Sequence, residues 1–130
     1  MLSLTEVALV FSGGAIGSGL RFGSMQLATT LGMRASLALG LINLFGCILA
    51  GVALRSFAQL GVGGLNSELT QTLLIGGVLG GFTTFSAVSL ECAASVASAQ
   101  RRRARIEAVA SIVLAVPMVR LGMLLASIGR

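Results

Sequence analysis

Long apolar runs separated by charged or turn-forming residues dominate the pattern along the chain. The second run is flanked by Arg34 and Arg55, and the third by Glu68 and Glu91. About 20 apolar residues are enough for a helix to cross a bilayer, although the first run is interrupted by Arg21. The pattern predicts four transmembrane helices, roughly at residues 5–27, 35–54, 69–90 and 106–128.

The connections between these runs are short, which leaves no room for a second domain. We therefore expect residues 1–130 to form a single four-helix membrane domain. Small residues stand four apart at Gly13 and Gly17 and again at Gly77 and Gly81. Such pairs let helix backbones approach closely. In the first run alone, the general glycine richness of membrane helices is the favoured explanation.

The third run differs from the others in its core, GGVLGGFTTFSAVS at residues 76–89. Four glycines, two threonines and two serines are a poor composition for an uninterrupted helix. We therefore expect a break in this helix. Irregular backbone at membrane depth is tolerated where it is buried or lines a wet cavity, and its carbonyls are natural cation ligands.

The composition identifies a membrane protein and narrows its chemistry. Hydrophobic residues make up 55 % and charged residues 10 % of the 130-residue chain, and the mean hydropathy is +0.99. The charged residues are nine Arg and four Glu, and the chain has no Lys, Asp, His, Tyr or Trp. Hydrolytic triads, His-based metal sites and Asp dyads are excluded, so we do not expect an enzyme.

The two cysteines and the start of the chain carry no further signal. Cys47 and Cys92 lack CxxC spacing and a neighbouring His, so we interpret them as small apolar residues rather than as disulfide partners or metal ligands. The first residues lack a basic region, which argues against a cleaved signal peptide.

Most of the positive charge, +5 in total, lies between predicted helices. We interpret the cluster of Arg101, Arg102, Arg103 and Arg105 as a cytoplasmic loop rather than a nucleic-acid patch. The side holding the first and third loops carries six arginines, and the side holding both termini carries two. By the positive-inside rule this bias predicts one orientation, with both termini outside.

Asn43 is the one strongly polar side chain in the second run and must find partners in hydrocarbon. Its amide is equally suited to an interhelical hydrogen bond and to donating to an anion in a pore. Phe85 stands inside the polar stretch, where its positive ring edge could contact an anion. No charged residue lies at comparable depth, which favours a small anion over a metal cation. Further hydroxyl donors that could equally bond to their own helix are Thr83, Thr84, Ser86, Ser89 and Ser111.

Three stretches carry a resemblance to a known family: GGAIGSGLRF at 13–22, LGLINLFGCILAG at 39–51 and GGFTTFSAVSLE at 80–91. They resemble the signature stretches of the CrcB/Fluc fluoride channel family, and the resemblance covers essentially the whole chain. It implies an all-α integral membrane protein that forms an antiparallel dimer with two fluoride pores and one central structural sodium ion.

The resemblance also implies roles for individual residues. Backbone carbonyls of Gly80 and Thr83 would hold the sodium ion, and Arg21 would lie near the pore entrance or act as a structural partner. The residues implied to line the pore for fluoride are Asn43, Thr84, Phe85, Ser86 and Ser111.

The function that the resemblance implies is passive export of fluoride across the bacterial plasma membrane, which relieves fluoride toxicity. The membrane potential would drive the anion outward with about 2.3 kcal/mol per charge per 100 mV.

The chain also departs from the family pattern. Val88, preceded by Ala87, replaces a second phenylalanine, Leu39 and Ala115 replace polar positions, and Arg120 replaces a small residue. Together with the arginine bias, these departures suggest one half of a heterodimeric pair with an oppositely oriented homologue.

Other functions compete with a complete channel. The alternatives are a non-conducting or half-pore partner subunit and, ranked low, a small multidrug transporter. Such a transporter needs an embedded carboxylate and aromatic residues, whereas Glu6 lies at the very start and Trp and Tyr are missing.

Overall fold

The computed structural model describes residues 3–60, 65–84, 89–90, 93 and 101–128, and these residues form helices without strands. Helices α3, η1 and α4 follow one another without a gap, so the described chain forms four helical rods. Their bounds are α1 Leu4–Thr30, α2 Ala35–Leu60, α3 Leu65–Gln71, the π-helix η1 Thr72–Leu79, α4 Gly80–Phe82 and α6 Arg101–Ile128.

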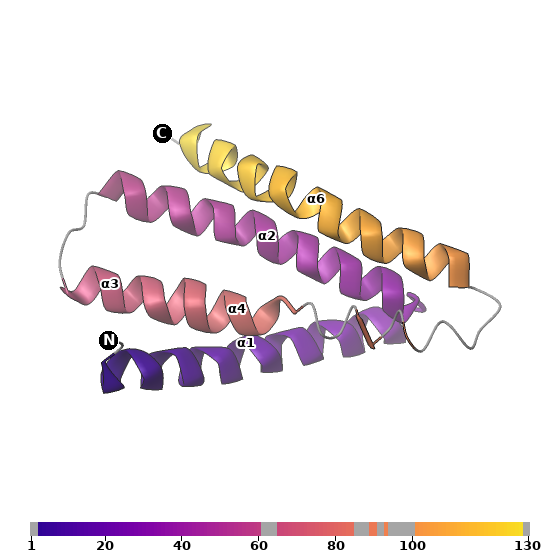
Figure 1. Cartoon of the computed structure of the whole chain (residues 1–130), viewed down its shortest axis with the longest axis horizontal. Helices are drawn as coiled ribbons and strands as arrows, with labels where there is room; N and C mark the ends of the chain where they lie inside the picture. Colours follow the sequence, from indigo (N-terminus) through magenta and orange to yellow (C-terminus); the bar gives the residue numbers. More distant parts are fainter. Residues whose placement is uncertain (1–2, 61–64, 85–88, 91–92, 94–100, 129–130) are drawn as a thin grey trace.

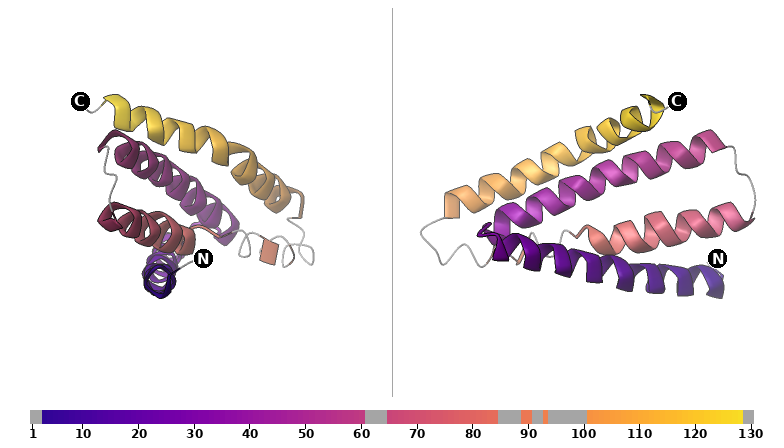
Figure 2. Two further views of the ribbon diagram at one scale, coloured as in Figure 1. Left: turned by 60° about the vertical axis from the view of Figure 1, so that its left-hand side comes forward. Right: turned by 180° about the vertical axis from the view of Figure 1, so that it is seen from behind.

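The rods are arranged as two pairs that lie side by side (Figures 1 and 2). Helix α2 packs chiefly against α6, and α1 packs chiefly against η1 and α4. Both termini lie at the same end of the rods (Figure 1).

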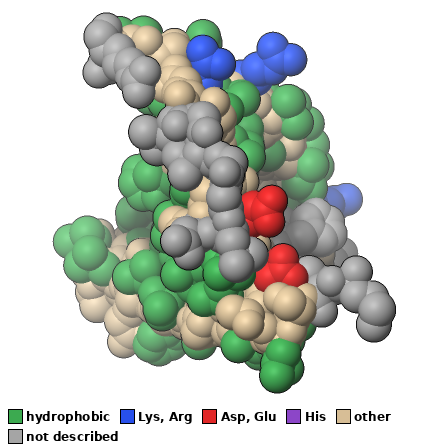
Figure 3. Space-filling model, turned by 90° about the vertical axis from the view of Figure 1, so that its left-hand side faces the viewer, with side chains coloured by type: hydrophobic (Ala, Val, Ile, Leu, Met, Phe, Trp, Pro, Cys, Tyr) green, Lys and Arg blue, Asp and Glu red, His purple; other side chains and the backbone are tan. Residues whose placement is uncertain are grey.

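Two helices of the described chain are long and apolar enough to cross a membrane, namely residues 35–59 and 105–128. Hydrophobic side chains cover much of the visible face in Figure 3, and large ones such as Phe11, Phe22 and Val116 are 70–77 % exposed. A soluble monomer rarely exposes so much contiguous apolar surface. The helices are therefore suited to a lipid environment.

Glycines allow α1 to approach η1 at backbone distance. A Cβ added to Gly13 would lie 2.9 Å from the Gly77 Cα, and one added to Gly17 would collide with the Val78 carbonyl oxygen. Such contacts exclude any larger side chain. The glycine pair of the first run is therefore a packing surface, and the explanation by general glycine richness is wrong. Gly19 on the same helix differs from Gly13 and Gly17, because nothing lies within 4 Å of a Cβ added there.

A second glycine contact joins α2 to α6. A Cβ at Gly51 would collide with the Val119 carbonyl oxygen, and one at Gly122 would collide with the Ile48 carbonyl oxygen. Each helix thus presents a glycine to the other's backbone. The two contacts hold the C-terminal halves of α2 and α6 together.

Glu6 has a local role at the start of α1. Its backbone N–H donates to Ser3 Oγ at 3.2 Å, and the Ser3 N–H donates to Glu6 Oε2 at 2.7 Å. This capping box satisfies two N–H groups that a helix start leaves without partners. A carboxylate used in this way is not the embedded acid that a cation transporter needs.

The third rod begins at Leu65, before the expected position 69, and its helix ends at Phe82. Thr83 has extended backbone, with φ −91° and ψ 141°. Residues 85–88 lie outside the described residues, so the expected break within this span is not confirmed. The structure does show that the helix ends at Phe82, immediately before the threonine pair of the polar stretch.

The arginine cluster differs from its expected position. Helix α6 starts at Arg101, so Arg102, Arg103 and Arg105 lie in its first two turns rather than in the preceding loop. Positive side chains at a helix N-terminus oppose the helix dipole. Glu107 offsets this charge, because its Oε1 lies 3.2 Å from Arg103 Nε one turn earlier.

Candidate functional site

Asn43 joins α2 to the segment that follows α4. Its Nδ2 donates to the Thr84 carbonyl oxygen at 3.3 Å, and the Thr84 N–H donates to Asn43 Oδ1 at 3.2 Å. One side-chain amide therefore pairs with both backbone groups of one residue. Extended backbone at this depth needs such partners, because lipid offers none.

The same pairing alters the end of α4. In a continuing helix the Thr84 N–H would donate to the Gly80 carbonyl, but it donates to Asn43 instead. The preceding residue remains helix-bound, since Thr83 N–H and Thr83 Oγ1 both donate to the Leu79 carbonyl at 2.9 Å. The bond from Thr83 to Leu79 is therefore the last regular one of the helix, and the Gly80 carbonyl does not receive the Thr84 N–H.

A groove of about 270 Å³ lies beside this junction. We call it the Asn43 groove. Its described lining combines amide and hydroxyl groups with small or apolar side chains and contains no charged residue. The lining residues are Asn43, Cys47, Thr83, Thr84, Ser111, Ile112 and Ala115. Such a surface offers hydrogen-bond donors without a fixed charge.

Ser111 lies on α6 opposite Asn43 and is 7 % exposed. Its Oγ donates to the Ala108 carbonyl at 2.8 Å, a bond within its own helix. In the structure this bond uses the only hydrogen of the Ser111 hydroxyl. To donate to an ion in the groove, the hydroxyl would have to rotate away from Ala108.

The structure brings together four of the residues singled out from the sequence: Asn43, Thr83, Thr84 and Ser111 line one groove. Gly80 lies one turn before this group on α4. Phe85 and Ser86, and also Ala87 and Val88, lie outside the described residues.

Arg21 is not part of the described lining of the groove. It lies on α1, and its Nε atom is buried without a hydrogen-bond partner.

The residues at which the chain departs from the family pattern are separated in space. Ala115 lines the groove, Leu39 is buried at 5 % exposure, and Arg120 is exposed on α6. Of these three positions, only Ala115 lies on the described groove surface.

Sequence reasoning did not single out Cys47 as a lining residue. It follows Asn43 by four positions on α2, as Ala115 follows Ser111 on α6. Residues four apart share a helix face, so this spacing was the available signal.

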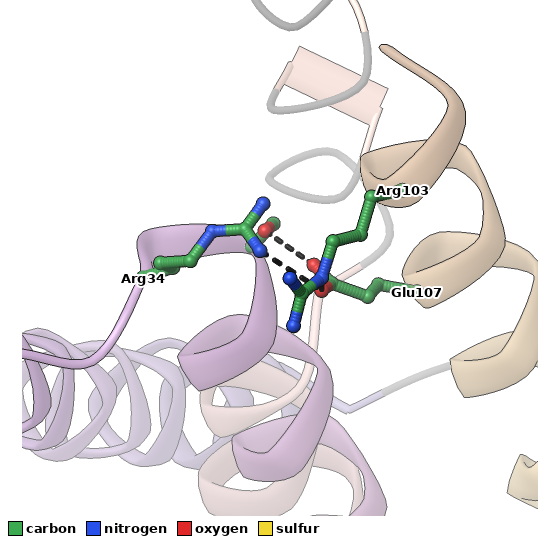
Figure 4. Close-up of polar contacts among 4 residues, drawn as sticks. Arg34, Arg103 and Glu107 are labelled. Atoms are coloured by element: carbon green, nitrogen blue, oxygen red, sulfur yellow. Dashed lines mark hydrogen bonds and ion pairs between the residues drawn. The ribbon is translucent and has the colours of Figure 1, made fainter. Parts of the chain in front are cut away.

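A polar cluster at the ends of α2 and α6 was also missed. Glu107 Oε2 accepts from Ser36 Oγ at 2.5 Å, and its Oε1 lies 3.2 Å from Arg103 Nε and 3.7 Å from Arg34 Nη1. The labelled side chains converge on the carboxylate (Figure 4). We call these four residues the Glu107 cluster.

The described residues contain no group of three or more His, Cys, Asp or Glu side chains that could hold a metal ion. The oxygen atoms at the end of α4 are backbone carbonyls and threonine hydroxyls.

The sequence pattern of the family described as CrcB-like protein, Camphor Resistance (CrcB), matches residues 8–123. The chain belongs to the CrcB family. The match extends over all four rods, so it includes both sides of the Asn43 groove.

Two relatives align with this chain over nearly their whole length. A protein of Novosphingobium aromaticivorans is 41 % identical over 123 residues, which is 92 % of this chain and 94 % of the relative. A protein of Caulobacter sp. strain K31 is 36 % identical over 124 residues, 95 % of each chain. Both are named fluoride-specific ion channel FluC. Members of this CrcB family are thus channels, not enzymes, as the composition predicted.

Proposed function

We propose that the chain is a fluoride-selective channel subunit and that the Asn43 groove is part of its ion pathway. The observation that carries the proposal is the groove itself, where amide and hydroxyl groups from three segments meet without a described charged side chain. The names of the two relatives support fluoride as the ion.

Neutral donors suit this ion. Fluoride is small and strongly hydrated, so a pathway must replace water without binding the ion too tightly for release. An amide NH₂ carries two hydrogens, and the bond to Thr84 uses one of those on Asn43. The other can donate to an ion. The Thr84 hydroxyl, and the Ser111 hydroxyl once it rotates away from the Ala108 carbonyl, would extend the set of donors. Phe85 and Ser86 follow Thr84 directly in the sequence.

A structural sodium ion belongs to the same proposal. The carbonyls of Gly80, the first residue of α4, and of Thr83, the first extended residue after it, would hold the ion. Support comes from the Thr84 N–H, which donates to Asn43 and so leaves the Gly80 carbonyl without that helical donor. A bound sodium ion would supply positive charge and fix the backbone at the end of α4.

The proposed assembly is an antiparallel dimer in the bacterial plasma membrane. With both termini at one end of the rods (Figure 1), the arginine bias favours a single orientation with the termini outside. The membrane potential would then drive passive fluoride efflux. Arg21, with its buried Nε, would act near the pore entrance or as a structural partner.

A half-pore or non-conducting subunit is the second candidate. The observation that favours it is Ala115, which lines the groove without a hydroxyl. In a heterodimer an oppositely oriented homologue would complete the remaining pore. The first candidate still accounts for the described groove more directly.

The test is fluoride efflux from liposomes that contain the purified chain, measured with a fluoride electrode and compared with chloride efflux. We expect fluoride-selective efflux from the chain alone or after co-expression with an oppositely oriented homologue. Robust efflux from the chain alone would exclude an obligate partner. The absence of fluoride-selective efflux from both preparations would refute the proposed function.

A further inference from the structure

The Glu107 cluster holds an unbalanced charge at one end of the α2–α6 pair. One carboxylate faces two guanidinium groups, those of Arg34 and Arg103. Arg102 and Arg105 are exposed on the same end of α6 and add positive charge. The Glu107 side chain is only 15 % exposed, whereas that of Arg103 is 70 % exposed. The negative group is thus the inner member of the cluster.

A cavity of about 130 Å³ borders this cluster between the N-terminal parts of α2 and α6. Its lining includes Ser36 and Glu107 and is otherwise mostly apolar, with leucines at positions 37, 41, 44 and 114. Its lining also includes Ser111, which lines the Asn43 groove as well. One buried serine therefore borders both spaces. Glu107 and Ser111 are four apart and share a face of α6.

We propose that the Glu107 cluster is the charged entrance of the ion pathway and that Glu107 sets how strongly this entrance attracts an anion. The inference rests on the proposed function and extends it to residues outside the Asn43 groove. The two arginines raise the local concentration of anions, as clustered charges do at the mouth of a cleft. The carboxylate reduces that attraction, so that an ion is not retained at the entrance.

If the cluster attracts anions, a more positive cluster should raise fluoride efflux and a less positive one should lower it. With one carboxylate against two guanidinium groups, the cluster carries +1. Glu107→Gln raises this to +2 and keeps an oxygen for the Ser36 hydrogen bond, whereas Arg34→Gln lowers it to zero. The double variant Arg34→Gln with Glu107→Gln restores +1 without the ion pair and is the matched control.

The experiment measures initial fluoride efflux at sub-saturating fluoride from liposomes that hold the full-length chain, with the homologous partner where wild-type flux requires it. We expect a rise of roughly three- to tenfold for Glu107→Gln and a comparable fall for Arg34→Gln. The double variant returns toward the wild-type rate. All differences shrink when an impermeant salt is added, because salt screens exposed charge.

A purely structural cluster gives a different result. Each single variant then lowers both flux and the thermal unfolding temperature, the double variant does not recover, and added salt has no effect on the ratios. That pattern, or equal flux in all variants, overturns the inference while leaving fluoride conduction by the wild type intact. Arg103→Gln keeps the contacts of Arg34 and Ser36 to Glu107, so it tests the sign of the charge effect even where other variants fold poorly. Lack of fluoride-selective flux in the wild-type preparations refutes the proposed function instead.

Discussion

Asn43 and Thr84 exchange two hydrogen bonds across the boundary between the helix pairs, at 3.3 and 3.2 Å. The side chain of one residue thus replaces the partners that a continuing helix would give the backbone of the other. This single pairing ends the regular bonding of α4, shapes the groove and links α2 to the third rod.

Asn43→Ala is expected to remove both hydrogen bonds between the Asn43 side chain and the Thr84 backbone. The loss of these two part-buried bonds should cost about 1–3 kcal/mol of stability. Fluoride efflux should fall sharply, because the pathway loses a donor and its backbone support. Unfolding in detergent and efflux from liposomes measure the two effects.

Asn43→Asp provides the comparison for this variant. It keeps an oxygen to accept from the Thr84 N–H but cannot donate to the Thr84 carbonyl, and it places a carboxylate in an anion pathway. We expect lower efflux with less loss of stability than for Asn43→Ala. Wild-type efflux from Asn43→Ala would mean that this chain contributes scaffold rather than pore.

Ser111→Ala is expected to lower fluoride efflux several-fold while changing stability by no more than about 1 kcal/mol, the usual net value of one hydrogen bond. Ser127→Ala is the matched control, since Ser127 Oγ donates to the Leu124 carbonyl within the same helix at 2.6 Å but is exposed. Equal efflux from both variants would assign the Ser111 hydroxyl to its bond with Ala108 alone.

Gly17→Val is expected to disrupt the packing of α1 on η1, because the added Cβ collides with the Val78 carbonyl. Overpacking of this kind costs about 1–3 kcal/mol or more. The measurement is the yield of monodisperse protein and its thermal unfolding temperature. Gly19→Val introduces the same side chain on the same helix where nothing lies within 4 Å, and it should behave like the wild type. Equal behaviour of the two variants would contradict the packing described for α1.

Removal of sodium is expected to reduce fluoride efflux if the Gly80 and Thr83 carbonyls hold a structural sodium ion. The chain is purified and reconstituted with N-methylglucamine in place of sodium, and efflux is compared before and after sodium is returned. Recovery on return of sodium supports the site. Undiminished efflux throughout would remove sodium from the proposal.

Asn43, Thr84 and Ser111 could be predicted as candidate site residues, because polar side chains inside apolar runs need partners. The structure places all three around one groove. What the sequence could not give was the pairing itself. The hydrogen bonds of Asn43 depend on where α4 ends relative to α2, which is a tertiary relationship between positions 41 residues apart.

Glu107 was overlooked for a different reason. A charge near the end of an apolar run usually marks the end of the membrane span, and the sequence pattern places the preceding arginines in a loop. The helix in fact begins at Arg101, which turns Glu107 toward Ser36 and Arg34. A prediction from apolar length alone places a helix boundary only to within about a turn. With that uncertainty, the contacts of Glu107 with Ser36 and Arg34 could not be predicted.

The glycine contacts between α2 and α6 have a further consequence for how the chain can vary. Because Gly51 and Gly122 meet main-chain atoms of the opposite helix rather than side chains, the alignment of the two helices along their axes is fixed by backbone shape alone. Residues on the outer faces can then be exchanged without sliding Ser111 past Asn43. Mutational tolerance should therefore be high at the lipid-facing positions and nearly absent at these two glycines, even though neither lines the described groove.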